Sequence, residues 1–150
     1  MLESFDEEVT AKEELKRADH LLYVTLKYTR TADVIHNLIK RLVSAFELCF
    51  EIILQDFKNN KKIKDVPKTG LEKAILLEKL MVKDKVFMDY ICFYYVLWEI
   101  KRNSYEGKEE YRKHVALISK DFTVKTDLLK EYYEITEDFV KWCEEEYKHD

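Results

Sequence analysis

The scarcity of glycine and proline constrains the fold of this chain more than any other feature of its sequence. Its 150 residues include two glycines and one proline, whereas average usage would give roughly 10 and 7. Chain reversals depend on these residues, so turns are few and the elements between them are long. Long elements are helices, because strands rarely exceed about ten residues. We therefore predict an all-α fold, an up-and-down bundle of four to five helices in a single domain over residues 1–150.

The first two helices are expected in the N-terminal third. Ser4 and Glu7 have the spacing of a capping box, in which each side chain bonds the backbone of the other residue. A helix should therefore begin there and end near Tyr28. Thr31 suits the N-cap of a second helix. From there to about Phe57 apolar residues recur every three or four positions, which is the clearest amphipathic pattern in the chain.

Two more helices are expected in the middle of the chain. A short one covers residues 71–81 and leads, through a bend near Lys83, into another over residues 84–101. The second has almost no polar face from Val86 to Trp98. A helix of this kind needs contacts on several sides, so it is either the central helix of the bundle or an interface.

The last third is expected to hold a small β-hairpin and a final helix. Residues 102–110 are polar and should be exposed. The partly β-branched runs 114–119 and 122–126 favour a hairpin, which is marginal unless it packs on a helix. Thr126 can cap the last helix. The apolar stripe of that helix comprises Leu128, Tyr132, Ile135, Phe139, Trp142 and Cys143.

The cysteines and the apolar runs bear on the compartment. Cys49, Cys92 and Cys143 lie far apart among apolar neighbours, which is the pattern of reduced core thiols rather than of a disulfide framework or a zinc site. The N-terminal segment lacks the charged and apolar regions of a secretion signal. The longest apolar run, residues 90–98, is about half of the ~20 residues that cross a bilayer. We expect a soluble, cytoplasmic protein without a membrane partner.

A lysine-rich loop is the first candidate binding segment. Residues 58–70 interrupt the helical pattern and hold the only proline of the chain. Their lysines could follow a phosphate backbone by releasing its counterions, although such a run also serves as a solubilising loop. The net charge of −4 argues against a whole surface built for nucleic acid and leaves room for a local basic patch. The candidate RNA-binding residues are Lys58, Lys61, Lys62 and Lys64.

The segment from Arg30 to His36 is the only stretch whose residue types and spacing could mark a catalytic site. Arginine can hold a phosphate while histidine moves a proton at neutral pH, so the pair could cleave RNA without a metal ion. In one continuous helix, residues six apart are about 9 Å apart along the axis and ~120° apart around it. Arg30 would have to reach His36 from the preceding turn, or a dimer would have to bring two copies together. The alternative is that Arg30 is a solvated turn residue and His36 the edge of a polar arc.

Metal and cofactor chemistry lack their sequence signatures. The four histidines form no HExxH motif and no His-x3-His pair, so no metal site is expected. The sequence contains no glycine-rich phosphate loop, which excludes a nucleotide cofactor, and its serines lack a nucleophile context. We therefore expect no cofactor.

Two stretches resemble a known group of proteins. Residues 16–25, Lys-Arg-Ala-Asp-His-Leu-Leu-Tyr-Val-Thr, followed closely by a second long amphipathic helix, are similar to the opening of small archaeal proteins of the HEPN-like helical superfamily. Residues 114–129 resemble their C-terminal region, where a short extended segment precedes the last helix. The resemblance implies a bundle of four or five helices over the whole chain, commonly paired into a homodimer.

The resemblance also carries an expectation about chemistry. Active members of the superfamily are metal-independent ribonucleases with an Arg-x4-6-His motif. By resemblance, Arg30 would stabilise the phosphate, Thr31 would be its polar neighbour and His36 would be the general acid or base. The superfamily motif normally lies near the last long helix, however, whereas this match opens the second. Many members are thought to have lost catalysis and to serve as binding or accessory modules.

Two functional hypotheses follow. The leading one is a non-catalytic HEPN-like helical protein that acts by association, as a homodimer and with a protein or RNA partner. The apolar helix over residues 84–101 and the absence of a well-placed site favour it. The alternative is a metal-independent RNA endonuclease that uses Arg30 and His36.

Overall fold

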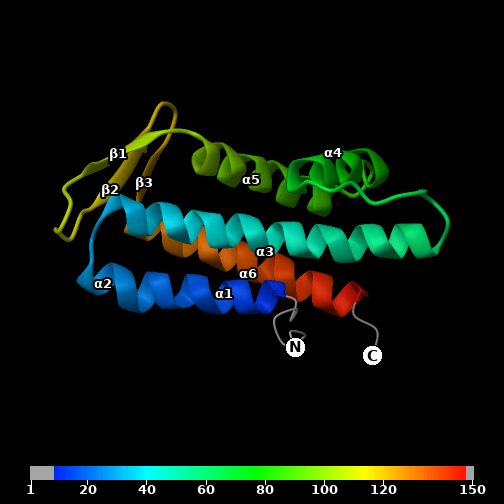
Figure 1. The fold of residues 1–150 in the computed structure, drawn as a ribbon, viewed down its shortest axis with the longest axis horizontal. Coiled ribbons are helices and arrows are strands. Elements are labelled where there is room, and N and C mark those ends of the chain that lie inside the picture. The colour runs from blue at the N-terminus through cyan, green and yellow to red at the C-terminus, as the bar shows by residue number, and fades with distance from the viewer. Residues whose placement is uncertain (1–8, 148–150) are drawn as a thin grey trace, which may run out of the picture.

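Helices account for most of residues 9–147, the part of the chain that the computed structural model describes, and a small antiparallel sheet lies at one end (Figure 1). This confirms the predicted helical character. The elements are α1 (Ala11–His20), the π-helical turn η2 (Leu21–Thr25), α2 (Leu26–Tyr28), α3 (Ala32–Asn59), α4 (Gly70–Leu80), α5 (Lys85–Arg102), β1 (Tyr105–Lys108), β2 (Ala116–Ser119), β3 (Thr123–Lys125) and α6 (Thr126–Tyr147).

The first helical run extends from α1 through η2 to α2 without a break. It begins with a capping box between Thr10 and Glu13: the Glu13 amide donates to the Thr10 hydroxyl at 3.1 Å, and the Thr10 amide donates to the Glu13 carboxylate at 3.0 Å. The capping box expected at Ser4 and Glu7 lies outside the described residues. The predicted end of this run near Tyr28 is confirmed.

Helix α3 is the central helix of the bundle. It contacts α1, α4, α5 and α6, and Figure 1 shows it between the α4–α5 pair and the α1–α6 pair. Its start is the predicted one, because the Thr31 hydroxyl accepts a hydrogen bond from the Val34 amide at 3.3 Å. Its buried residues are Ala32, Val34, Ile35, Leu38, Ile39, Leu42, Val43, Ala45, Phe46, Cys49, Phe50, Ile53 and Leu54.

Because α3 is the central helix, α5 is not. The prediction that the helix over residues 84–101 could be the central helix of the bundle is wrong. Helix α5 buries one stripe, in which Tyr94 is fully covered, and it packs mainly against α3. Val86 and Cys92 are exposed, so Cys92 is not the core thiol that the sequence suggested. The buried stripe is Phe87, Ile91, Tyr94, Leu97 and Ile100.

The sheet has three antiparallel strands in the order β1-β2-β3, rather than the two expected. The predicted hairpin is β2 and β3, whose buried residues Leu117 and Val124 pair with each other. Strand β1 falls in the segment 102–110, which was expected to be polar and exposed and for which no strand was predicted, with Tyr105 paired to Ser119. Its side chains are mostly exposed, so it carries no apolar alternation by which a strand is recognised. Contacts of β1 and β2 with α3 support a sheet this small.

Helix α6 begins close to the predicted position, with Thr126 as its first residue rather than its N-cap, and its buried stripe is rotated by about one residue. Leu128 and Tyr132 are half-buried, whereas their neighbours Leu129 and Tyr133 are buried. Apolar residues occupy both adjacent rows of this helix, so the pattern alone does not choose between them. The packing of α6 against both α1 and α3 determines which of the two rows is buried. The buried residues are Leu129, Tyr133, Thr136, Phe139, Val140 and Cys143.

Candidate functional site

Arg30 lies in the turn that joins α2 to α3, as the sequence indicated. Its carbonyl oxygen accepts a hydrogen bond from the Tyr111 amide at 2.6 Å, which fastens the turn to the loop between β1 and β2. In the same loop, the Glu110 carboxylate accepts from the Ala32 amide at 2.8 Å. The backbone from Arg30 to Ala32 is thus held, and the half-buried Arg30 side chain projects from this turn.

Arg30 lines a hollow of about 290 Å³ at the end of the bundle, which we term the cationic hollow. Three regions that are far apart in the sequence contribute to it: the run η2–α2 with the turn that follows it, the β1–β2 loop and the first two turns of α6. The lining residues are Leu22, Tyr23, Leu26, Lys27, Arg30, Lys113, Thr126 and Lys130.

The charge of the cationic hollow is of one sign. Lys27, Arg30, Lys113 and Lys130 line it, and no carboxylate does. Within residues 9–147, these four cations form no ion pair with an aspartate or glutamate. Four positively charged side chains therefore line one small volume in a chain whose net charge is −4. An anion would relieve their mutual repulsion.

Three exposed tyrosines lie at this same end of the bundle. Tyr23 lines the cationic hollow and is 49% exposed. Tyr28 ends α2, two residues before Arg30, and is 80% exposed, while Tyr111 is 76% exposed. Large aromatic side chains with this much exposure have an unused stacking surface. Cations and exposed aromatic side chains thus lie at the same end of the molecule.

His36 has different surroundings. Its Nε2 atom donates to the carbonyl oxygen of Lys101 at 2.8 Å, at the end of α5. Its ring stacks on Tyr105, with 4.6 Å between the ring centroids. His36 is not among the residues that line the cationic hollow, whereas Arg30 is. The structure therefore gives the two predicted catalytic residues separate contacts, and the pairing of Arg30 with His36 in catalysis stays a prediction.

The lysine-rich loop is at the opposite end of α3 from the cationic hollow (Figure 1). Since α3 has 28 residues, the two ends are about 42 Å apart, too far for both to hold one phosphate. The lysines named from the sequence are exposed. The hollow beside them mixes signs, because Glu51 and Asp65 line it together with Lys58 and Lys73. A role for Lys58, Lys61, Lys62 and Lys64 in RNA binding stays a prediction.

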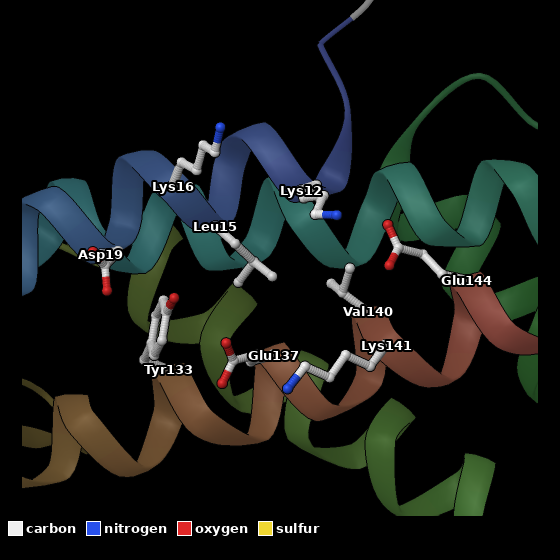
Figure 2. Close-up of a pocket in the computed structure, with 9 residues that line it drawn as sticks. All are labelled: Lys12, Leu15, Lys16, Asp19, Tyr133, Glu137, Val140, Lys141 and Glu144. Carbon is white, nitrogen blue, oxygen red and sulfur yellow. The ribbon is translucent and has the colours of Figure 1, made fainter.

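A second groove runs between α1 and α6, and its charges are balanced. Figure 2 shows that Leu15 and Val140 face each other across it, with charged side chains around them. Tyr133 lies beside Asp19 in this view, and its burial, together with the carboxylates of Asp19 and Glu137, raises the pKa of Tyr133 to about 12. Three lysines and three carboxylates line the groove, so it does not select for an anion. They are Lys12, Lys16, Lys141, Asp19, Glu137 and Glu144.

Sequence reasoning missed most of the cationic hollow. It named Arg30, but not Lys27, Lys113 or Lys130, because these lysines are isolated in the sequence and only the fold gathers them. One local signal was present: Lys113 follows Arg112 and precedes His114, a short basic cluster in the β1–β2 loop. The exposure of the tyrosines has no sequence signature, since the core of this chain also contains tyrosines.

Metal-binding clusters, membrane-spanning helices and similarity to known proteins identify no further site among residues 9–147. Within residues 9–147 no three His, Cys, Asp or Glu side chains gather as a metal site would require. None of the described helices has the length and apolar character needed to cross a bilayer. Comparison with protein-family models, with curated proteins and with solved structures found no match to this chain.

Proposed function

We propose that this protein is a non-catalytic, HEPN-like helical protein that acts by association, and that it associates with single-stranded RNA at the cationic hollow. The gathering of Lys27, Arg30, Lys113 and Lys130 around one hollow carries the proposal. Phosphate contacts by lysine and arginine supply most of the affinity in non-specific nucleic-acid binding. The resemblance of residues 16–25 and 114–129 to the superfamily supports it further, because residues of both stretches line the hollow.

The exposed tyrosines favour single strands over duplexes. Bases of a single strand can splay out and stack on aromatic side chains, whereas bases within a duplex are already stacked. Tyr23, Tyr28 and Tyr111 offer such surfaces beside the cations. Single-stranded binding combines these two features, a positively charged track and stacking platforms.

The surroundings of His36 support association rather than catalysis. A general acid or base must exchange its proton with the substrate, but the Nε2 proton of His36 is donated to the Lys101 carbonyl and the ring is covered by Tyr105. The proposal therefore assigns no cleavage step to Arg30 and His36.

Fluorescence anisotropy with a labelled single-stranded RNA of about 12 nucleotides, in EDTA, tests the proposal. The full chain should bind, and the logarithm of its association constant should fall with the logarithm of the salt concentration with a slope of about −3, as expected for four phosphate contacts to a single strand. No binding at low salt would contradict the proposal.

A matched pair of charge reversals tests the location. Lys113 and Lys64 are both exposed loop lysines at opposite ends of α3, so Lys113→Glu and Lys64→Glu change the net charge equally. We expect Lys113→Glu to weaken binding at least about tenfold and Lys64→Glu to change it by no more than about twofold. The reverse order would place RNA on the lysine-rich loop, and equal effects would indicate only a response to net charge.

The homodimer belongs to the same proposal. Ile75, Val82 and Val86 are 43%, 61% and 62% exposed on and between α4 and α5, and these apolar side chains are the surface that a second copy would cover. Mass measurement in solution tests this part: a monomer at high micromolar concentration would remove the dimer and leave the RNA proposal standing.

A further inference from the structure

We infer that the cationic hollow binds the terminal phosphate monoester of an RNA strand, rather than an internal phosphodiester. The inference rests on the proposed function, since it names which part of the RNA occupies the hollow. Three properties of the hollow lead to it: its charge, its closed floor and the ordered backbone segments that carry its cations.

The charge of the hollow exceeds what an internal phosphate needs. A phosphodiester carries one negative charge, whereas a phosphate monoester carries about −1.5 to −2 at neutral pH and presents three strong acceptor oxygens. Four cations line the hollow, and Arg30 among them can bond two oxygens at once with its planar fork. The Thr126 hydroxyl is a further donor at the hollow. This number of cations and hydrogen-bond donors suits a phosphate monoester, which has more charge and more free oxygens than a phosphodiester.

The hollow is closed on its inner side. Leu22 and Leu26 line it and are only 5% and 3% exposed, because both belong to the core. A group that enters from solvent therefore ends at this floor. The volume of about 290 Å³ is at the small end of the range for ligand sites, which begins near 300 Å³, so the hollow suits a phosphate with part of its sugar. An end of a strand fits this shape better than a phosphate within one, which has chain on both sides.

The backbone segments around the hollow are held by contacts outside it. The turn that carries Arg30 is fixed by the Tyr111 amide and by the bond from the Ala32 amide to Glu110. The same two bonds hold the β1–β2 loop, which carries Lys113. Thr126 and Lys130 stand on the first two turns of α6, a helix of 22 residues, whose N-terminal dipole favours an anion beside these side chains. Because these backbone segments are already ordered, an anion binds without the cost of ordering a loop.

Tyr23 is placed to take the base of the terminal nucleotide. It lines the hollow and remains 49% exposed. The rings of Tyr23 and Tyr133 are nearly perpendicular, with 6.5 Å between centroids and an interplanar angle of 87°. Because about half of the Tyr23 side chain is exposed beside this contact, ring surface remains available for stacking.

The test compares one RNA sequence in three forms: with a 5′-phosphate, with a 3′-phosphate and with hydroxyls at both ends. The full chain should bind one phosphorylated form about tenfold more tightly than the hydroxyl form at the same salt concentration, and that form identifies the end that is bound. Equal affinities for all three forms would overturn the inference while leaving the proposed function intact. Absence of binding to every form would overturn both.

Variants locate the preference. Arg30→Gln and Lys130→Gln should each reduce the preference for the phosphorylated end to about twofold or less, while Lys64→Gln at the other end of α3 should leave it unchanged. Lys130 stands on an exposed helix position, so its substitution tests the hollow even if Arg30→Gln disturbs the turn. A preference that persists in both variants would place the terminal phosphate elsewhere and overturn the inference.

Discussion

His36 donates a hydrogen bond from Nε2 to the carbonyl oxygen of Lys101 at 2.8 Å, and this bond ties the first third of α3 to the end of α5. The same ring stacks on Tyr105 of β1, whose hydroxyl donates to Asp33, one turn earlier on α3. His36 therefore lies where two helices and the sheet meet. Its contacts are those of a residue that joins elements.

Replacement of His36 should lower stability. His36→Ala removes the donor to the Lys101 carbonyl and the stacking on Tyr105, so we expect a loss of about 1 to 3 kcal/mol in the free energy of unfolding. Urea denaturation followed by circular dichroism measures it. Asn37→Ala, at the next and exposed position of α3, is the matched control and should change stability by less than about 0.5 kcal/mol. Equal effects at the two positions would argue against a joining role.

The same variant tests the ribonuclease alternative. Wild-type protein incubated with structured RNA in EDTA should produce no cleavage, because the His36 ring is occupied by Lys101 and Tyr105. Cleavage by the wild type that is lost in His36→Ala would instead establish a metal-independent endonuclease. Circular dichroism of the variant must accompany the assay, since an unfolded variant would lose activity for another reason.

Gly70 is required by the position of Glu47. A Cβ atom at residue 70 would collide with the Glu47 carboxyl group, and this carboxylate accepts a hydrogen bond from the buried Tyr94 hydroxyl at 2.6 Å. We expect Gly70→Ala to displace Glu47 and to cost about 1.5 to 3 kcal/mol, the range for hydrogen bonds to charged groups. In the Tyr94→Phe background that bond is already absent, so the cost should be smaller. Equal costs in both backgrounds, measured by urea denaturation, would show that Gly70→Ala acts by another route.

The sequence was sufficient where structure depends on neighbouring residues, and insufficient where it depends on distant ones. The cap at Thr31 and the bend before α5 were predicted, because a cap is a contact within one turn. The close approach of Cys49 to Cys143 was not, since these residues lie on α3 and α6 and only packing joins them. The cationic hollow has the same origin, as Lys27, Lys113 and Lys130 come from three separate segments. Of the cations that line the hollow, only Arg30 belongs to a motif that can be recognised in the sequence.

Stability should decrease at alkaline pH. The hydrogen bond to Asp33, and then burial, raise the pKa of Tyr105 to about 12, compared with about 10 in an unfolded chain. The folded state therefore holds this proton more tightly, so the contribution to stability is complete below pH 10 and is lost as the pH rises through 12. Urea denaturation across this pH window should show the decline. Tyr105→Phe has no proton to lose there and should give a shallower decline; an unchanged slope would argue that other tyrosines dominate.

The three cysteines should differ sharply in reactivity. Cys92 is exposed, whereas Cys49 and Cys143 are each 1% exposed and adjacent, with the Cys143 thiol donating to the Cys49 carbonyl oxygen at 3.9 Å. A hydrogen bond with Cys143 and burial raise the pKa of the Cys49 thiol well above its usual range, and the thiolate is the reactive form. A chromogenic disulfide reagent should therefore modify one thiol per native chain rapidly and all three after urea denaturation. Cys92→Ser should abolish the rapid reaction; a rapid phase that survives in this variant would show that the core between α3 and α6 opens readily.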